Sequence, residues 1–484
     1  KEGYVSPPIP AVDPKFTTTA STVDRRKGPP MPESFPALNF PALQRATLSN
    51  GMRVVLAERP GLPVVQMNLQ FEGGFAADAG RRIGTSSFTM GMLDEGAGER
   101  DALAFGDRAE SLGAQLNAGA SLDGGSAFLS ALTENLDESL ALYADMIQRP
   151  RFAEADVERV RATWLATIQQ EKARPNSLAN RLLPPLMYGE GHPYAIPFSG
   201  TGSEASIAAL TIDEMKAYHR DFVRPEGATL IIVGDTTLAA ITPLLEKHFG
   251  GWRPAAVSLP ARTLPTVALP KQPRVFLVDQ PGAVQATILA GQLAPSTTDE
   301  RSVEFDIANS VLGGEFSSRL NMNLREKRSW AYGAYSFVSA AKGQRPWIAF
   351  APVQIDKTAE SLKEMQREIA DYAEGRAPAT ADEVAKIQAA EIRSLPGSFE
   401  TANAVLGQIG GMVRFDRPDN WVEVRRGRIE GLNPAVVNDA ARTLDPDALT
   451  WVVVGDLSKI EAPMRALNLG EVKVIDADGK PVAR

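Results

Sequence analysis

A long internal repeat limits the fold of this chain more than any other feature of its 484 residues. The run RVVLAERPGLPVVQ begins at Arg53, and RVFLVDQPGAVQ begins 221 residues later, at Arg274. TLIIVGDTT, which contains Asp235, matches LTWVVVGDLS, which contains Asp456, at the same spacing. ADVERVRATW and ADEVAKIQAA form a third pair, displaced by 226 residues. Three landmarks in the same order at nearly the same spacing indicate an internal duplication.

Each copy shows the same succession of elements. Short Val/Ile/Leu runs bounded by Gly, Pro or Asp predict strands, and stretches such as ENLDESLALYADMIQRP, with apolar residues three and four apart, predict helices. We therefore predict an α+β protein of two homologous domains, each a mainly antiparallel sheet covered by helices on one face. The length of the chain gives each domain enough residues to bury its own core.

Proline-rich segments mark the predicted domain boundaries. Residues 1–41 are rich in Pro, Ser and Thr and lack a sustained apolar period, so we predict an extended arm there. Residues 253–273 contain five prolines and no helical period, which predicts a linker. The N-terminal domain is then residues 42–252, and the C-terminal homologous domain is residues 274–484.

Composition excludes several classes of protein. No apolar run reaches the roughly 18 residues of a membrane span, and a net charge of −8 argues against nucleic acid as a partner. The absence of cysteine excludes disulfides, thiolate metal sites and a cysteine nucleophile. The sequence begins at Lys1 rather than Met, as in a processed or engineered form. We expect a removed export signal and a periplasmic location, with the cytoplasm as the alternative.

Three parts of the chain carry distinctive motifs. They are LSNGMRVVLAERPGLPVVQMNLQFEGG (48–74), YGEGHPYAIPFSG with YHRDFVRPEGATLIIVGD (188–200 and 218–235), and LGGEFSSRLNMNLREKRSWAYGAYS (312–336). The first two parts resemble the N-terminal domain of the pitrilysin/insulinase family of zinc peptidases, which includes the processing peptidases and bacterial two-domain relatives. The third part resembles the most recognisable C-terminal motif of that family. The likeness covers roughly residues 43–460.

The zinc motif of that family is missing from this chain. The family motif is His-x-x-Glu-His on a helix, where two His at i and i+4 share one face and bind Zn²⁺, and the Glu acts as general base. The resemblance places this motif within GTSSFTMGMLDEG, at Ser87, Phe88, Thr89, Met90 and Gly91. A further Glu ligand of the family falls in IQQEKARPNS, where Gln169 or Gln170 stands and Glu171 is displaced. Neither the ligands nor the base is present.

No other arrangement of residues replaces the lost motif. The chain has three histidines, His192, His219 and His248, and their separation in sequence prevents an i, i+4 pair. Asp94 and Glu95 are the carboxylates nearest to the lost motif, and we expect them to be surface or helix-cap residues. We expect His192, in the turn-like GHPY, to anchor the local backbone, and the other two histidines to lie on helix surfaces. We therefore predict no metal site and no catalytic residue on this chain.

The second copy contains a pair of residues that the family uses for substrate binding. Arg325 and Tyr332, seven residues apart in LREKRSWAYGAYS, match the Arg/Tyr pair that in the relatives binds substrate across from the zinc. The change from a helical to an alternating pattern places Arg325 near a helix end and Tyr332 at the start of a strand. Both can donate hydrogen bonds to a peptide carbonyl. The alternative is a structural Arg paired with Glu326. Ser329-Trp330 replaces the usual Gly-Leu of the relatives, which affects the expected local backbone shape.

The resemblance implies a function that needs a second chain. We predict a zinc-free subunit of a heterodimeric zinc metalloendopeptidase, inactive alone, which forms half of a closed peptide-degrading chamber and contributes Arg325 and Tyr332 to substrate binding. The expected partner is a sister subunit of similar size that carries His-x-x-Glu-His and the zinc, and the expected substrates are unfolded or short peptides. No cofactor is expected on this chain.

Two other interpretations remain open. The first is a structural or peptide-binding homologue with no proteolytic role, like the core subunits of respiratory complexes. The second is a homodimer that traps peptides without cutting them.

Overall fold

The structure is a computed structural model that describes residues 24, 26, 28, 34–253 and 258–482. The chain divides into two units, Lys1–Leu38 and Asn39–Arg484. In the first unit, the guanidinium group of Arg26 pairs with Asp24 at 2.8 Å, and most of the predicted arm, residues 1–41, lies outside the described residues. The second unit contains both sheets of the described chain.

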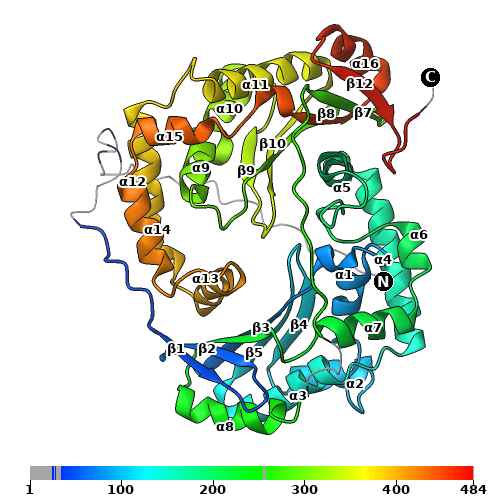
Figure 1. Ribbon diagram of the computed structural model, residues 1–484, viewed down its shortest axis with the longest axis vertical. Helices are drawn as coiled ribbons and strands as arrows, with labels where there is room; N and C mark the ends of the chain where they lie inside the picture. The colour runs from blue at the N-terminus through cyan, green and yellow to red at the C-terminus, as the bar shows by residue number, and fades with distance from the viewer. Residues whose placement is uncertain (1–23, 25, 27, 29–33, 254–257, 483–484) are drawn as a thin grey trace, which may run out of the picture. The chain divides into compact units, whose positions relative to one another are not determined.

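The first half of the second unit is built on one sheet with the strand order β1-β2-β6-β3-β5-β4 (Figure 1). β2 and β6 are parallel, and the other neighbouring strands are antiparallel. β5, with the sequence GSAFLSAL, alternates between buried and half-buried residues, as a strand with one face on the core should. The strands are β1 (Leu43–Thr47), β2 (Arg53–Glu58), β3 (Val64–Phe71), β4 (Gln115–Ala120), β5 (Gly125–Leu132) and β6 (Thr229–Gly234).

Helices of the first half cover one face of this sheet and form a large apolar core with it. Local signals fix their ends: in α7, the Thr211 side chain accepts from the backbone N–H of Glu214, whose carboxylate accepts from the Thr211 N–H in return. The helices are α1 (Thr85–Gly91), α2 (Ala102–Ser111), α3 (Leu136–Gln148), α4 (Glu154–Ala173), α5 (Pro175–Tyr188), α6 (Glu204–Ala208), α7 (Ile212–Phe222) and α8 (Leu238–Phe249), with 3₁₀ turns η2 (Phe75–Asp78) and η3 (Thr133–Asn135).

The second half repeats this plan with the strand order β12-β7-β11-β8-β10-β9. Its strands are β7 (Arg274–Asp279), β8 (Gln285–Ala294), β9 (Tyr335–Val338), β10 (Arg345–Gln354), β11 (Thr450–Gly455) and β12 (Glu471–Ile475). Its helices are α9 (Ser302–Asn309), α10 (Arg319–Asn321), α11 (Thr358–Ala373), α12 (Ala381–Ser398), α13 (Ala402–Arg414), α14 (Trp421–Glu430), α15 (Pro434–Ala441) and α16 (Leu457–Ala466). The remaining turns are the π-helical η4 (Ser310–Gly314) and η5 (Met322–Lys327) and the 3₁₀ turns η6 (Ile355–Lys357) and η7 (Pro446–Ala448).

Five strands of each sheet have the same order under the sequence repeat: β2-β6-β3-β5-β4 correspond to β7-β11-β8-β10-β9. The sixth strands differ, because β1 pairs antiparallel with β2 and β12 pairs parallel with β7. This arrangement confirms the predicted α+β class with two homologous, mainly antiparallel sheets. Among the described residues, no helix is long and apolar enough to cross a membrane.

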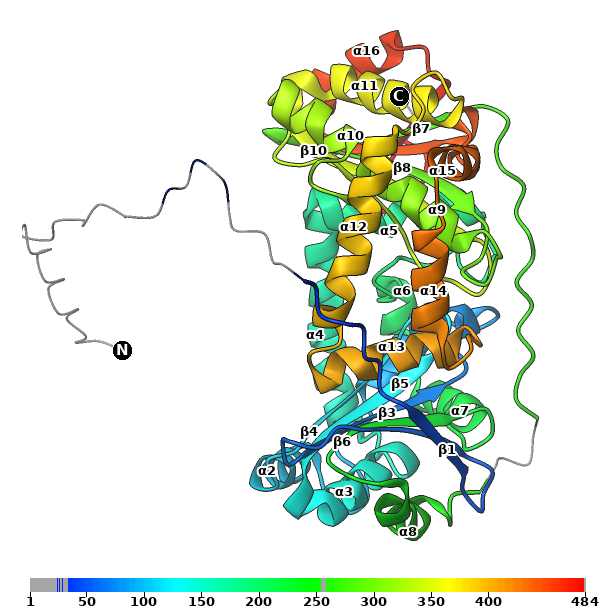
Figure 2. The same cartoon turned by 90° about the vertical axis from the view of Figure 1, so that its left-hand side faces the viewer.

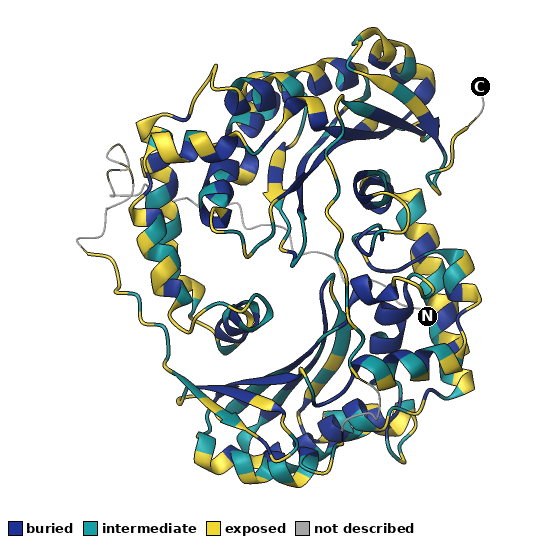
Figure 3. Ribbon diagram, in the orientation of Figure 1, coloured by how far each residue is buried: buried dark blue, intermediate teal, exposed yellow. Residues whose placement is uncertain are grey.

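One helix of each half packs on the sheet of the other half. α13 packs on the first sheet, where Val405, Leu406 and Ile409 join the buried side chains of β2 and β6. In return, α5 packs on β8 and β11 of the second sheet. Covering on both faces explains why every residue of the central strands β6 and β11 is buried (Figure 3). The exchange adds apolar packing between the two halves.

Residues 258–273 connect the halves without forming a helix or strand (Figure 2). Hydrogen bonds fix their path: the Arg262 guanidinium donates to the backbone oxygens of Gly73 and Asp123 at 3.0 and 3.2 Å. Further along, the amide of Gln344 both donates to and accepts from the backbone of Val267. The linker is therefore attached to both halves of the chain.

Candidate functional site

The segment that replaces the zinc motif is a buried core helix. Ser87, Phe88, Thr89 and Met90 all lie in α1 and are buried. The ring of Phe88 meets Trp164 edge to face at 5.3 Å between centroids. The hydroxyls of Ser87 and Thr89 have no hydrogen-bond partner among the described residues. This face of α1 offers no metal ligand, and its apolar packing takes the place of one.

Asp78, at the end of η2, caps α1. Its carboxylate accepts from the backbone N–H of Gly84 at 2.7 Å and of Ser86 at 2.9 Å. These bonds satisfy two of the donors that an α-helix leaves free at its start. Burial raises the pKa of Asp78 to about 7, although these two hydrogen bonds and the nearby Arg81 act against that rise.

A buried ion pair lies beside α1, near the expected third ligand position. Gln169 and Gln170 are exposed on α4, whereas Glu171 pairs with the buried guanidinium of Arg181. Thr201 donates to the same carboxylate oxygen of Glu171 at 2.8 Å. Arg181 also donates to Thr201 and to the Gly202 carbonyl. A guanidinium group thus balances the charge of Glu171.

The three histidines make separate structural contacts. The Tyr194 N–H donates to Nδ1 of His192 at 3.0 Å, so Nε2 of His192 carries the proton and donates to the Pro265 carbonyl at 3.0 Å. His192 therefore anchors local backbone, as predicted, and also contacts the linker. Nε2 of His219 lies 2.7 Å from the Ile147 carbonyl, and Nε2 of His248 lies 2.7 Å from a carboxylate oxygen of Asp137.

The carboxylates after α1 are not gathered with these histidines. Glu95 pairs with Arg159, and burial raises the pKa of the half-buried Asp94 to about 6. In the part of the chain that the structure describes, no three His, Asp or Glu side chains lie close enough together to hold a metal ion. The residues of this chain therefore do not fit the zinc of the family motif.

The pair in the second half occupies an open pocket. Arg325, in η5, and Tyr332, in the loop before β9, line one pocket of about 620 Å³ together with Val284, Trp330 and Gln354. Tyr332 as a residue is 86% exposed. The strand begins at Tyr335 rather than at Tyr332, and Ala331 makes a single bridge to β10. The structure therefore places both predicted residues on the same solvent-facing surface.

The guanidinium of Arg325 is supported by an aromatic ring. It lies 4.6 Å from the centroid of Phe316, and one nitrogen lies 3.4 Å from a carboxylate oxygen of Glu326. The ion pair with Glu326 is the structural interpretation considered from the sequence. At 3.4 Å between half-exposed groups it is a weak contact. The guanidinium N–H groups face a pocket and are placed to bind an acceptor.

Ser329 adopts the backbone conformation that glycine favours. Its φ is +55°, in the left-handed region that costs energy for a residue with a Cβ. The Ser329 carbonyl accepts from the side chain of Gln354 at 3.0 Å. Ser329 therefore forms this left-handed turn with a Cβ in place.

Two buried asparagines, which were not predicted from the sequence, hold the loop of Tyr332. Asn321 donates from Nδ2 to the Phe316 carbonyl at 2.6 Å and accepts at Oδ1 from the Ala334 N–H at 3.2 Å. Asn309 accepts from the Ser336 hydroxyl at 2.6 Å and donates to the Ser336 carbonyl at 3.1 Å. In the sequence, these two asparagines are distinguished only as polar residues at positions where the helical pattern predicts apolar ones.

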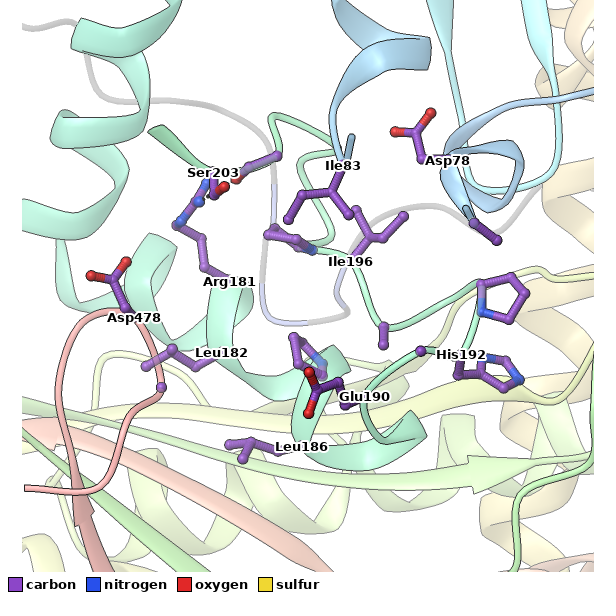
Figure 4. A pocket seen from close by; sticks show the side chains of 18 of the residues that line it. Asp78, Ile83, Arg181, Leu182, Leu186, Glu190, His192, Ile196, Ser203 and Asp478 are labelled. Atoms are coloured by element: carbon purple, nitrogen blue, oxygen red, sulfur yellow. Dashed lines mark hydrogen bonds between the residues drawn. The ribbon is translucent and has the colours of Figure 1, made fainter. Parts of the chain in front are cut away.

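A separate pocket of about 710 Å³ opens beside Arg181 and His192 of the first half and Asp478 of the second (Figure 4). Two of its charged groups have partners: Arg181 pairs with Glu171, and Asp478 accepts from Lys172 at 2.5 Å. It includes neither residue of the Arg325 and Tyr332 pair.

Two protein-family profiles match this chain. The profile described as insulinase (peptidase family M16) matches residues 53–198, and the profile described as peptidase M16 inactive domain matches residues 209–391. The chain belongs to the insulinase family, peptidase family M16. Within this family it has the two-sheet fold, and its zinc-motif segment is the buried helix α1, which has no His or Glu.

Individual M16 relatives carry contrasting descriptions. An uncharacterized zinc protease of Bacillus subtilis, YmxG, is 25% identical over 300 residues, which are 62% of this chain and 70% of that protein. A Helicobacter pylori protein described as a non-peptidase homolog is 21% identical over 413 residues, 84% of this chain and 92% of that one. The solved structure of a peptidase M16 inactive domain from Pseudomonas fluorescens superposes with a TM-score of 0.79 at 26% identity, covering 86% of this chain and 98% of its own.

Proposed function

We propose that this chain is the zinc-free subunit of a heterodimeric M16 zinc endopeptidase and contributes Arg325 and Tyr332 to substrate binding. One observation carries the proposal: the zinc-motif segment is a buried helix without a zinc ligand, while Arg325 and Tyr332 of the same chain line an open pocket. A chain that kept only its fold would have no evident need to hold these two donors at a pocket surface.

The chemistry of the pair suits a peptide backbone. The guanidinium of Arg325 and the exposed phenol of Tyr332 are both hydrogen-bond donors, and a peptide carbonyl oxygen accepts from both kinds of group. The Phe316 ring supports one side of the guanidinium. In this role the two residues orient and polarise a substrate carbonyl, and all zinc chemistry belongs to the partner.

The proposal assigns the remaining parts as follows. The partner is a sister subunit of similar size that carries His-x-x-Glu-His and the zinc, and the two chains together enclose a chamber for unfolded or short peptides. We place the pair in the periplasm. Neither chain is active alone. The relatives described as zinc proteases and as a non-peptidase homolog support a family in which both kinds of chain occur.

The test begins with the partner. The chain is isolated from its native extract, and a stoichiometric protein that carries His-x-x-Glu-His is expected to stay bound. Peptide hydrolysis is then measured for each chain alone and for the pair reassembled from purified chains. We expect activity from the pair alone. Recovery of the chain without such a partner would favour the structural or peptide-binding homologue instead.

Two variants then test the assigned residues. Arg325→Ala and Tyr332→Phe should each lower kcat/KM of the pair about tenfold or more, because a hydrogen bond to a charged or polarised group contributes about 1.5–3 kcal/mol. Assembly, followed by size-exclusion chromatography, should be unchanged. Leu103→Ala, which alters a 79% exposed residue of α2, is the control and should match the unmodified pair. Unchanged hydrolysis in both variants would remove the assigned role.

A further inference from the structure

A further pocket, of about 610 Å³, lies against the linker that joins the two halves. This linker runs along the outside of the molecule in Figure 2, and its residues 259–264 all line the pocket. The other lining residues come from the first half, apart from Lys342, which lies between β9 and β10. The volume is in the range of pockets that hold small molecules.

The lining of this pocket is more basic than the chain as a whole. It contains four cationic side chains and one carboxylate, whereas the chain has a net charge of −8. These five residues are Arg53, Arg81, Arg262, Lys342 and Glu72. The four cations come from β2, from the loop before α1, from the linker and from the turn after β9. Folding thus brings together cations that are far apart in the sequence, which favours an anion in the space between them.

Carboxylates balance three of the four cations. The pairs, with their N–O distances, are Arg81 with Asp221 at 3.0 Å, Arg262 with Asp123 at 3.3 Å and Lys342 with Glu72 at 3.0 Å. The side chain of Arg53 is exposed and forms no hydrogen bond or ion pair with any residue that the structure describes. Four cations against three carboxylates leave one positive charge in excess at this pocket.

Arg262 keeps two hydrogen-bond donors for a ligand. Its Nη1 donates to the backbone oxygens of Gly73 and Asp123. Its Nη2 lies 3.9 Å from Glu72, beyond hydrogen-bond distance, and neither Nη2 nor Nε donates to a residue in the described part of the chain. These two nitrogens form one edge of the guanidinium group, and such an edge can bind a carboxylate or a phosphate through two parallel hydrogen bonds.

The sequence repeat provides an internal comparison for Arg53. In the second sheet the equivalent Arg274, opposite Thr450, donates to the Thr450 hydroxyl at 2.7 Å and to the Leu186 carbonyl at 2.8 Å. In the first sheet Arg53 is opposite Thr229, but the buried Thr229 hydroxyl has no partner among the described residues. The arginine that begins the second sheet's strand therefore has protein acceptors, whereas Arg53 lines a pocket and has none.

We propose that this pocket binds a small organic anion, whose carboxylate or phosphate group is held by Arg53 and Arg262. The unpaired charge of Arg53 and the free edge of Arg262 select the oxyanion. Phe222 and Leu264 line the same pocket and would contact an apolar body of the ligand. The ligand would connect β2 with the linker. This binding needs no zinc-bearing partner, so it goes beyond the proposed peptidase function.

Isothermal titration calorimetry on the isolated full chain compares benzoate, phenyl phosphate and benzyl alcohol, which share one ring and differ in charge. At least one of the two anions should bind at least about tenfold more tightly than benzyl alcohol, because charge-assisted hydrogen bonds are stronger than neutral ones. The tighter anion identifies the oxyanion of the ligand. Added NaCl should weaken its binding, because salt screens exposed charges. Equal affinity for all probes, or no binding of either anion, would overturn the proposal.

Variants locate the site. Arg53→Ala and Arg262→Ala should each lower the affinity for the tighter anion about tenfold or more, because each removes a hydrogen bond to a charged group. Thr263→Trp, at an exposed position of the linker, should fill the pocket and prevent binding. Circular dichroism and the urea midpoint check that each variant is folded. Arg442→Ala alters another exposed arginine without a side-chain partner in the described chain, and it should bind as the unmodified chain does. Unchanged affinity in folded Arg53→Ala would refute the assignment.

Hydrogen exchange distinguishes this pocket from other places where an anion could bind. The tighter anion should slow exchange in linker residues 258–273 of the unmodified chain and leave Arg53→Ala unaffected. If Arg325→Ala abolished binding while Arg53→Ala did not, the anion would occupy the pocket of Tyr332, and the proposal would fail. None of these measurements uses the assembled pair, so their failure would leave the proposed peptidase function to its own tests.

Discussion

The guanidinium group of Arg325 lies 4.6 Å from the centre of the Phe316 ring, on a surface where that ring is itself 55% exposed. Phe316 lies just after η4, and Arg325 lies within η5. Asn321 ties Phe316 to the loop of Tyr332, because it binds the Phe316 carbonyl with one end of its amide and the Ala334 N–H with the other.

Phe316→Ala should weaken substrate binding by the assembled pair without affecting assembly. A cation–π contact at an exposed site contributes about 0.5–1 kcal/mol, so kcat/KM should fall about two- to fivefold, mainly through KM. Steady-state hydrolysis of a reporter peptide measures this. Phe316→Tyr keeps the ring and should retain most of the activity. If Phe316→Ala were as active as the unmodified chain, the ring would have no role in holding Arg325.

Ser329→Gly should stabilise the chain by up to about 1 kcal/mol. Glycine relieves the left-handed strain of about 1–2 kcal/mol, and the greater entropy of its unfolded state offsets part of that gain. Urea midpoints report the change. Ser329→Ala keeps the Cβ and should show no gain, so equal stabilisation by both variants would contradict this account of the turn.

Asn321→Leu should destabilise the second half by about 1–3 kcal/mol, because the buried Ala334 N–H loses its acceptor. It should also free the loop of Tyr332, and hydrogen exchange across residues 330–336 would show faster opening there. Asn420→Leu alters an exposed asparagine whose side chain makes no cap bond, and it serves as the control. If the loop amides of Asn321→Leu kept the protection of the unmodified chain, the loop would not depend on the hydrogen bonds of Asn321.

Stability should fall between about pH 4 and about pH 7 through Asp78. Burial raises its folded pKa to about 7, so the unfolded chain releases this proton first, and each further unit of pH then favours unfolding. A rise of about three pKa units corresponds to about 4 kcal/mol. Above about pH 7 this contribution becomes constant.

Asp78→Asn cannot ionise, so its stability difference from the unmodified chain should become more favourable by several kcal/mol between pH 4 and pH 8. It also loses one capping hydrogen bond at every pH, at a cost of about 1 kcal/mol. Thermal midpoints at matched ionic strength measure the difference. Leu103→Ala, which alters an exposed side chain without a titratable group, should show no such trend. Parallel pH profiles for Asp78→Asn and the unmodified chain would contradict the raised pKa.

Ile409→Ala should cost about 2–5 kcal/mol, the usual range for a fully buried Ile. The loss should appear in both halves, because Ile409 belongs to α13 of the second half and packs on the first sheet. Hydrogen exchange in β6 should therefore accelerate together with exchange in α13. Val424→Ala, which shortens a 36% exposed side chain of α14, should change the urea midpoint little. Unchanged protection of β6 would mean that the halves unfold independently.

The sequence by itself determined the repeat, the α+β class and the residues of the pair. Strand runs such as TLIIVG and helix signals such as the Thr211 capping box are local, so their physical causes can be read from neighbouring residues. Loss of the zinc motif was equally clear, because an i, i+4 ligand pair depends only on spacing along one helix.

The tertiary structure alone decided how distant segments meet. Exchange of α5 and α13 between the halves joins residues that lie far apart along the chain, such as Ile409 and Ile231, which no local period specifies. The same holds for Glu171, whose charge is balanced by Arg181, and for the asparagines that hold Tyr332 in place. Side-chain identity sets what each residue can bind, but burial and partner geometry, which arise only on folding, decide what each one binds.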